Sequence, residues 1–521
     1  MAADLHVPNR IGQIAHAVGD DPRPCNLTLR DPDSRDRGSE MTSLGKKVVS
    51  SAAWAAVETW GRQVAMFAVF VILARHLGPE EFGLATLAMI APTILATVVT
   101  RGIPDALVQR AEIEPIHLDS AFWLLVATGA TLSALIWAFA GVVAEAFGEP
   151  LLEDLVRWTG IIVVVQSLAA VPTAVLKREL NFRLFTLRTL TGTMVGGTVG
   201  LTMAIAGYGM WSLVLMQVAK AIVETTVILL GSSWRPRMAY SYARCRELFG
   251  FAGPVIVQTL WTFVNEEIPK VILGLFLGPV AVGVYAIARR PLDLLGEFLL
   301  GPLAAITMPA VARVQREPDK IDHFFNTSVR MAAIAGFPAF VGFAAIAPVA
   351  VPLVFGPQWA SAVVAVQILM ILGLQRTIDS LCAYTILALG HSKLVLKLNM
   401  TYTLFSLVLL TAAAQISLEA VIAALVACNL LLLPVFLFYV QHTAHIDVSK
   451  PLAIFPRLAG AAALMFAIVS AWLLAAPDDL PQAVTVAAGI AIGAPIYIAA
   501  AVLLVRADLL KARDMLLSLR E

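Results

Sequence analysis

The sequence predicts an all-α polytopic membrane protein with about 14 transmembrane helices, arranged as two six-helix bundles in a pseudo-two-fold arrangement plus two C-terminal helices. Three observations predict this fold class. Hydrophobic residues make up 59% of the 521 residues and charged residues only 14%, whereas soluble domains carry about 25% charged residues. Fourteen apolar stretches are long enough to cross a membrane, and the basic residues between them fall almost entirely on one side.

The first 40 residues differ in composition from everything that follows. They carry five basic and seven acidic side chains and no apolar run of signal-peptide length. We therefore expect residues 1–40 to form a disordered tail. Met41 stands shortly before the first apolar stretch, so a mis-assigned start, with translation beginning at Met41, is the alternative interpretation.

The apolar stretches each hold about 20 residues or more, the length at which a helix spans a hydrocarbon core of about 30 Å. Gly and Pro interrupt several of them, which membrane helices tolerate where they face protein or a cavity. The expected spans are 48–74, 82–108, 119–144, 154–176, 185–206, 209–231, 249–277, 279–308, 328–354, 361–388, 395–414, 417–440, 453–475 and 483–505.

The distribution of Lys and Arg indicates the orientation, because positively charged loops stay in the cytoplasm. If the N-terminus is inside, 28 basic residues fall in cytoplasmic loops and tails, and only Arg75 and Arg157 fall in loops on the opposite side. A miscounted span would invert every loop after it. The sequence therefore predicts a multi-pass protein with both termini in the cytoplasm.

Two segments 200 residues apart form an internal repeat. LARHLGPEEFGLATLA at 73–88 and LGLFLGPVAVGVYAIA at 273–288 align without gaps and share six of sixteen residues, including the Leu-Gly-Pro turn and the glycines Gly83 and Gly283. Six spans separate the copies, so both keep the same orientation and the repeat relates two parallel halves. Chance recurrence of Leu-Gly-Pro turns is the alternative, which the gapless spacing disfavours.

The repeat and the loops divide the chain into five parts. Transporters built from two parallel halves enclose a central cleft and hold their substrate between the halves, near the middle of the bilayer. We expect the tail at 1–40, an N-terminal six-helix bundle at 41–232, a cytoplasmic linker at 233–250, a C-terminal six-helix bundle at 251–440, and two extra helices with a cytoplasmic tail at 441–521.

Seven basic side chains remain inside the predicted spans, where each costs roughly 2.5–3.5 kcal/mol on insertion scales and needs a partner or a water-filled cavity. A spacing of four residues places two side chains on one face of a helix. We interpret Arg101 with Asp105, and Lys220 with Glu224, as structural pairs near helix ends. The remaining basic groups at mid-depth are candidates for a binding site.

A cluster of arginines in a shielded cleft suits a diphosphate, because guanidinium donates paired hydrogen bonds to phosphate oxygens and stays charged. A carboxylate beside these groups is a candidate to carry a coupling ion. The predicted substrate-binding residues are Arg62, Arg289, Arg290 and, as a weaker fourth member, Lys270. The predicted ion-coupling residues are Glu58, Asp293, Glu297 and Glu266.

Three segments, LARHLGPEEFGLATLAMI, AVLKRELNFR and GYGMWSL, carry a family resemblance. In order and spacing they resemble the polysaccharide-transporter branch of the multidrug/oligosaccharidyl-lipid/polysaccharide exporter superfamily, and more narrowly its Wzx-type flippases, over roughly residues 41–440. The resemblance implies a V-shaped pair of six-helix bundles and alternating access. It also implies a cationic cavity, to which Arg62, Arg289 and Arg290 correspond by location.

The function implied by this resemblance is transport of undecaprenyl-pyrophosphate-linked oligosaccharide from the cytoplasmic to the periplasmic leaflet of a Gram-negative inner membrane. Such a flippase serves exopolysaccharide, lipopolysaccharide or capsule biosynthesis. Its partners would be the lipid-linked oligosaccharide, membrane lipids, and the polymerase and glycosyltransferases of the same pathway.

Other functions stay open at this point. A multidrug or cation antiporter of the same superfamily would use an acidic cavity. A peptidoglycan-precursor flippase would bind a lipid diphosphate in the same way, but with a different head group attached to it. A membrane-embedded polysaccharide polymerase is less compatible, because the longest predicted outer loop has about ten residues. The sequence has no GxxxxGK[ST] motif, no spacing typical of a metal site and no basic excess, so we expect no ATPase, no cofactor and no nucleic-acid partner.

Overall fold

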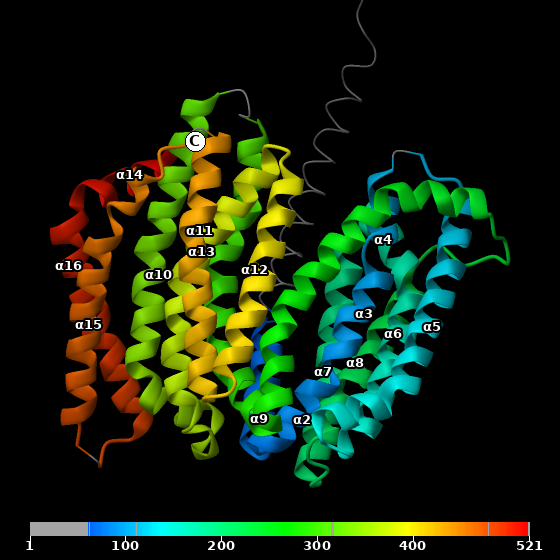
Figure 1. The fold of residues 1–521 in the computed structure, drawn as a ribbon, viewed down its shortest axis with the longest axis horizontal. Helices are drawn as coiled ribbons and strands as arrows, with labels where there is room; N and C mark the ends of the chain where they lie inside the picture. Colours follow the sequence, from blue (N-terminus) through cyan, green and yellow to red (C-terminus); the bar gives the residue numbers. More distant parts are fainter. Residues whose placement is uncertain are drawn as a thin grey trace, which may run out of the picture. The chain divides into compact units, whose positions relative to one another are not determined.

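The computed structural model describes residue 61 and residues 63–518, apart from residues 111, 314–316, 445 and 478. The described residues form helices joined by short turns and contain no β-strand (Figure 1). In chain order the helices are Gln63–His76, α2 (Pro79–Ala88), α3 (Ile90–Thr100), α4 (Ile103–Gln109), α5 (Pro115–Phe147), α6 (Leu151–Arg178), α7 (Phe182–Ile205), α8 (Trp211–Gly231), α9 (Tyr242–Arg313), α10 (Pro318–Phe355), the short 3-10 helix η1 (Pro357–Trp359), α11 (Ala362–Ala388), α12 (Ser392–Ala413), α13 (Leu418–Ala444), α14 (Ser449–Leu452), α15 (Phe455–Ala475) and α16 (Gln482–Ser518).

The predicted fold class is confirmed. Among the described residues, eleven helical segments are long and apolar enough to cross a membrane. One of them, Ala252–Leu299, contains two of the predicted spans, and another, Pro79–Gln109, contains the three helices α2 to α4, where one span, 82–108, was predicted. Every other predicted span after the first coincides with helix, whereas the first, 48–74, lies partly outside the described residues. The chain is therefore a multi-pass membrane protein.

Helix α9 consists of two segments, because Gly278 interrupts it. Gly278 has φ 78° and ψ −178°, a conformation that glycine adopts without a steric penalty. The chain turns sharply there, so residues 242–277 and 279–313 correspond to two crossings (Figure 1). The Leu-Gly-Pro turn between Gln63–His76 and α2 is the other copy, where Pro79 occupies the first turn of α2 and Glu81 accepts a hydrogen bond from the Gly78 N–H at 3.1 Å.

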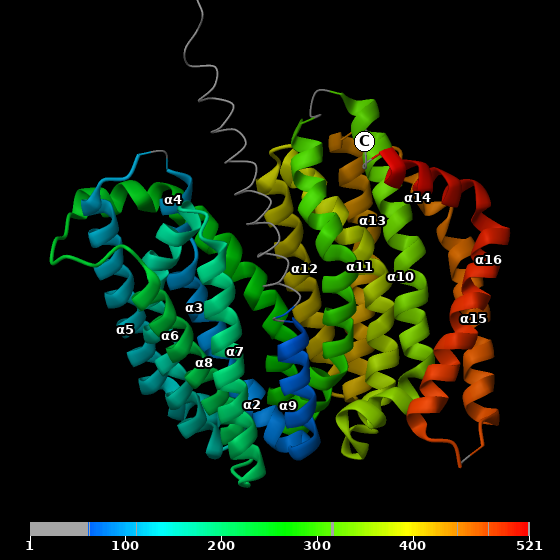
Figure 2. The same ribbon diagram turned by 180° about the vertical axis from the view of Figure 1, so that it is seen from behind.

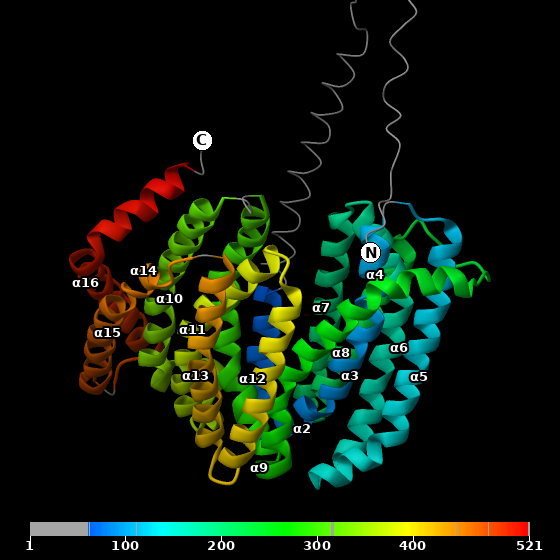
Figure 3. The same cartoon turned by 45° about the horizontal axis from the view of Figure 1, so that its top comes forward.

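The helices pack in two groups that α9 connects (Figure 2). Helices α3 to α8 pack mainly on one another and form the first group with α2, which packs mainly on α9; helices α10 to α13 form the second group, against which α15 and α16 pack through α10. Residues from both groups contribute to one continuous hydrophobic core, which includes the fully buried Leu73, Tyr285 and Trp359. Figure 3 shows α15 and α16 at the side of the second group, away from α5 and α6.

The two copies of the repeat meet directly. A Cβ atom added at Gly83 would lie 1.8 Å from the carbonyl oxygen of Pro279, and one added at Gly283 would lie 2.0 Å from the carbonyl oxygen of Pro79. Each copy therefore presents the same glycine to the same carbonyl of the other copy. This reciprocity is what a two-fold axis between the two turns requires, so the repeat seen in the sequence is a repeat in space.

Hydrogen bonds join the helix Gln63–His76 to α10 and η1 at this end of the molecule, which we call the hairpin end. The side chain of Arg75 donates hydrogen bonds to the carbonyls of Leu353 and Val354, the two residues before the last residue of α10. In return, Gln358 Nε2 and Trp359 Nε1 donate to the carbonyl of Ala74, at 2.9 and 2.7 Å. These bonds satisfy carbonyls that a helix end leaves unpaired, and they hold this helix against the second group.

The beginning of α9 is held by charges to the turn between α4 and α5. Glu247 accepts hydrogen bonds from Arg110 at 2.8 Å and from Arg244 at 3.0 Å, and Arg244 also pairs with Glu114. The bonds from Arg110 and Arg244 lower the pKa of Glu247 to about 2. Because α9 begins at Tyr242, this attachment falls inside the segment 233–250 that we expected to be a linker.

Candidate functional site

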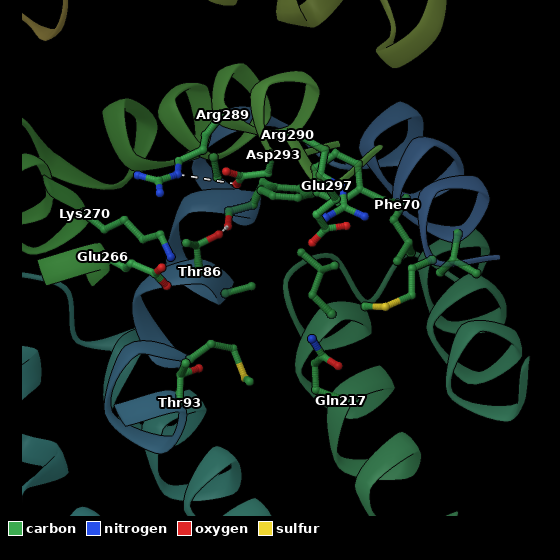
Figure 4. A pocket seen from close by; sticks show the side chains of 18 of the residues that line it. Phe70, Thr86, Thr93, Gln217, Glu266, Lys270, Arg289, Arg290, Asp293 and Glu297 are labelled. Carbon is green, nitrogen blue, oxygen red and sulfur yellow. Dashed lines mark hydrogen bonds and ion pairs between the residues drawn. The ribbon is translucent and has the colours of Figure 1, made fainter. Parts of the chain in front are cut away.

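A cavity of about 870 Å³ lies between the two groups of helices. One wall is formed by Gln63–His76, α2, α3, α7 and α8, and the other by α9 and α11. Figure 4 shows Arg289, Arg290, Asp293 and Glu297 on one side, and Thr93 and Gln217 on the other. We call the two sides the α9/α11 wall and the α3/α8 wall.

The α9/α11 wall carries most of the charge. Nine charged side chains line the cavity, five of them basic and four acidic, and eight of these nine belong to α9 or α11. Helix α9 contributes both of its segments, because the turn at Gly278 brings the residues before and after it to the same wall. The eight are Glu266, Glu267, Lys270, Arg289, Arg290, Asp293, Glu297 and Arg376.

Asp293 is at the centre of an ion-pair network on this wall. Its Oδ1 accepts a hydrogen bond from Arg376 Nη1 at 2.9 Å, and its Oδ2 lies 3.4 Å from Arg289 Nε. Arg289 also donates to the hydroxyl of Tyr285 at 2.8 Å. One carboxylate thus orients two guanidinium groups, and an anionic ligand that replaced it would meet both.

Lys270 pairs with a different carboxylate from the one its spacing favours. Its Nζ lies 2.8 Å from both oxygens of Glu267, three residues before it, rather than beside Glu266, four residues before it. Glu267 is buried and Glu266 is exposed, so the buried carboxylate takes the cation that compensates its charge. Lys270 is therefore largely neutralised.

Arg290 contacts a helix of the opposite wall, Gln63–His76. Its guanidinium lies 5.3 Å from the centre of the Phe70 ring, a cation–π contact. Phe70 in turn packs edge-on against Phe82 and Phe355. Arg290 thus joins the two walls on the side of the cavity towards the hairpin end.

The structure brings six of the eight predicted site residues to one cavity. The other two, Glu58 and Arg62, lie outside the described residues. Arg289 and Asp293, four residues apart on α9, form an ion pair. The six residues that line the cavity are Glu266, Lys270, Arg289, Arg290, Asp293 and Glu297.

Of the two predicted structural pairs, one is wrong and one has an additional partner. The helix predicted across 82–108 breaks at Gly102, whose φ is 69°, so Arg101 and Asp105 do not share a continuous helical face. Lys220 does pair with Glu224, at 4.0 Å, but Arg188 of the neighbouring helix binds the same carboxylate more closely, at 2.9 Å. This contact between α7 and α8 cannot be seen from spacing along one helix.

Sequence reasoning missed several residues of the cavity, among them Arg376, Lys220 and Gln217. Arg376 binds Asp293 across 83 residues of sequence. Lys220, interpreted as structural, lines the α3/α8 wall, and so does Gln217, one turn before it. Lys220 could have been found, because a basic residue inside a predicted span is unusual. Gln217 could not, because the sequence does not distinguish it from other polar residues in membrane helices.

Comparison with known proteins identifies the family. The family model described as "Polysaccharide biosynthesis protein" matches residues 72–364, more than half of the chain. The chain belongs to this family. The match includes both copies of the repeat and most of the charged wall of the cavity.

Relatives with assigned names agree with the family. The succinoglycan biosynthesis transport protein ExoT of Rhizobium meliloti is 26% identical over 62% of this chain and 65% of its own length, slightly less than two thirds. The lipopolysaccharide biosynthesis protein WzxC of Escherichia coli is 23% identical over 69% of this chain and 74% of its own. In fold, the chain is similar to the lipid II flippase MurJ, with a TM-score of 0.72 at 14% identity over 87% of this chain and 98% of that one.

Proposed function

We propose that this protein is a flippase that moves an undecaprenyl-diphosphate-linked oligosaccharide from the cytoplasmic to the periplasmic leaflet of a bacterial inner membrane. The product would feed exopolysaccharide, lipopolysaccharide or capsule biosynthesis. One observation carries the proposal: Arg289 and Arg376 face one cavity with Asp293 between them. Family membership and the named transport functions of the relatives support the substrate class.

The network around Asp293 suggests how a diphosphate would bind. Guanidinium groups donate paired hydrogen bonds to phosphate oxygens, so a diphosphate can replace the carboxylate as the partner of Arg289 and Arg376. The side chains of Arg289 and Arg376 are 14% and 31% exposed, so they are already partly desolvated and held in place. Asp293 would then need a new compensating charge, which makes it the preferred candidate for ion coupling over Glu266 and Glu297.

We further propose that both termini are cytoplasmic and that the hairpin end faces the periplasm, as the distribution of Lys and Arg indicates. In this orientation the bonds of Arg75, Gln358 and Trp359, together with the contact between Gly83 and Gly283, separate the cavity from the periplasm. Transport by alternating access then requires these contacts to break.

A second candidate, export of organic cations in exchange for an ion, is favoured by two carboxylates. Glu266 and Glu297 line the cavity, and neither forms an ion pair within the described part of the chain. A cationic ligand could use them, as in an antiporter. The two functions differ in what the arginines do, because a cation gains nothing from Arg289.

Reconstitution tests the proposal. Proteoliposomes containing the purified full-length protein should transfer fluorescently labelled undecaprenyl-diphosphate oligosaccharide between leaflets, measured by quenching from one side. Arg289→Ala should abolish transfer, whereas the matched control Arg157→Ala, which removes an arginine paired with Glu153 far from the cavity, should retain it. Transport of ethidium but not of the lipid would favour the antiporter and contradict the flippase.

A further inference from the structure

The two walls of the cavity come from equivalent positions of the repeat. At the same offset of 200 residues that relates Gly83 to Gly283, five residues of the α9/α11 wall correspond to five residues of the opposite wall, and all ten line the cavity. The corresponding pairs are Met66 with Glu266, Phe70 with Lys270, Thr86 with Ala286, Met89 with Arg289, and Thr93 with Asp293. In four of these five pairs, an uncharged side chain of the first copy therefore corresponds to a charged side chain of the second.

The α3/α8 wall offers hydrogen bonds from uncharged side chains. Thr97 and Thr100 of α3 donate their hydroxyl groups to carbonyls of their own helix, at 2.6 and 2.8 Å. Thr93, on the same helix, makes no such bond to any described residue, and its side chain lines the cavity. Its hydroxyl is consequently available to a ligand.

Gln217 on α8 is available in the same way. The other polar side chains of α8 that face protein are satisfied, as Ser212 by the Gly209 carbonyl and Thr225 by the Val165 carbonyl. Gln217 makes no side-chain hydrogen bond within the described residues and lies at the cavity surface. An amide that is both donor and acceptor costs free energy in a membrane helix unless water or a ligand engages it.

The surroundings of these two groups are apolar. Met66, Met89 and Met216 line the same wall. Among the described residues, Lys220 is the one charged side chain of this wall, and its Nζ lies 4.0 Å from Glu224. The other polar groups of the wall are uncharged and stand on an apolar surface, which matches a sugar ring with hydroxyl groups at its edge and C–H groups on its faces. A diphosphate is better matched by the cations of the opposite wall.

We propose that the α3/α8 wall is the subsite for the sugar residues of the lipid-linked substrate, and that Thr93 and Gln217 are the residues that recognise their hydroxyl groups. This inference rests on the proposed flippase function and divides the substrate between the two walls. The diphosphate lies on the α9/α11 wall and the first sugars lie on the α3/α8 wall. A complete substrate then bridges the two groups of helices, whereas a lipid diphosphate without sugar contacts only one of them.

Binding measurements on the purified full-length protein in nanodiscs test this division. The probes are undecaprenyl diphosphate and the undecaprenyl-diphosphate oligosaccharide extracted from the source bacterium after deletion of its polymerase. Gln217→Leu and Thr93→Val should each weaken binding of the oligosaccharide lipid by about tenfold or more, because each removes a hydrogen bond to a buried ligand group. Binding of undecaprenyl diphosphate should stay within about twofold of the unsubstituted protein.

Two further variants separate this inference from the function on which it rests. Arg289→Ala should weaken both probes, and Thr100→Val, on the same helix but bonded to its own carbonyl, should weaken neither. If Gln217→Leu and Thr93→Val bind both probes as tightly as the unsubstituted protein does, or lose affinity for both probes by the same factor, the sugar subsite is wrong. The proposed flippase function would still stand. Absence of binding of either probe to the unsubstituted protein, or full binding by Arg289→Ala, would overturn the proposed function instead.

Discussion

A methyl group at Gly83 should open the hairpin end. In the structure, a Cβ atom at this position would lie 1.8 Å from the Pro279 carbonyl oxygen, and ordinary contacts begin at 3.4 Å, so the two turns must separate by about 1.6 Å. The atom in the way belongs to the backbone of a helix end, which cannot rotate aside. Overpacking of this kind costs about 1–3 kcal/mol. Gly83→Ala should therefore shift the equilibrium from the closed to the open hairpin end by a factor of about 5 to 150.

Spin labels on the exposed residues Glu80 and Ser361 can report this change, because they lie on the two groups of helices at the hairpin end. The labels would be attached to Glu80→Cys and Ser361→Cys in a protein whose four native cysteines are replaced by alanine. Double electron–electron resonance should show a longer distance, or a second longer population, when Gly83→Ala is added. Lipid transfer should fall, because the closed state is needed in each cycle.

Two further substitutions make the test specific. Gly283→Ala should act like Gly83→Ala, because its Cβ would lie 2.0 Å from the Pro79 carbonyl oxygen. Gly78→Ala is the matched control, since no atom lies within 4 Å of the position of its Cβ and its φ is −77°. Unchanged distances and native transport in both Gly83→Ala and Gly283→Ala would refute the conclusion that these turns form a closed contact.

Three other predictions concern charges. Arg290→Ala should abolish polymer export in complementation at native protein levels, while Arg290→Lys should recover only part of it, because lysine lacks the planar fork of guanidinium; full activity of Arg290→Ala would contradict the role of this residue. Asp293→Asn should leave transport but remove its sensitivity to a protonophore, and sensitivity equal to that of the unsubstituted protein would exclude Asp293 as the coupling residue. The pKa of Glu247 is lowered from 4.5 to about 2, so its ion pairs contribute stability that is present above pH 4.5 and lost as the pH falls towards 2. The unfolding temperature of Glu247→Gln should therefore fall less between pH 4.5 and pH 2 than that of the unsubstituted protein. An equal fall in both proteins would contradict this role of Glu247.

The helices were predictable from the sequence because hydropathy and loop charge are sums over many residues. A span of about 20 residues averages out single exceptions, and the alternation of Lys and Arg checks the count independently. The pair of Arg289 with Asp293 was also predictable, because it depends on spacing within one helix.

The rest of the site depends on contacts that spacing does not encode. Arg376 reaches Asp293 from another helix, and Arg188 of α7 joins Lys220 as a second partner of Glu224. Gly102 breaks a helix that hydropathy shows as continuous, because an apolar average carries no information about φ. Lys270 chooses between two adjacent carboxylates according to their burial, which is a property of the folded molecule.

The positions of the repeat are of two kinds: those where the two copies contact each other and those that face the cavity. Gly83 and Gly283 must both be glycine in this geometry, because each faces a backbone carbonyl of the other copy and neither can accept a side chain. Thr93 and Asp293 face the cavity instead of a backbone carbonyl of the other copy, so a side chain fits at both positions and the two can differ. The symmetric positions therefore form the contact that must close in each cycle, and the asymmetric ones give each wall its own ligand chemistry. A substrate that is anionic at one end of its head group and sugar at the other can use such a cavity in one orientation only.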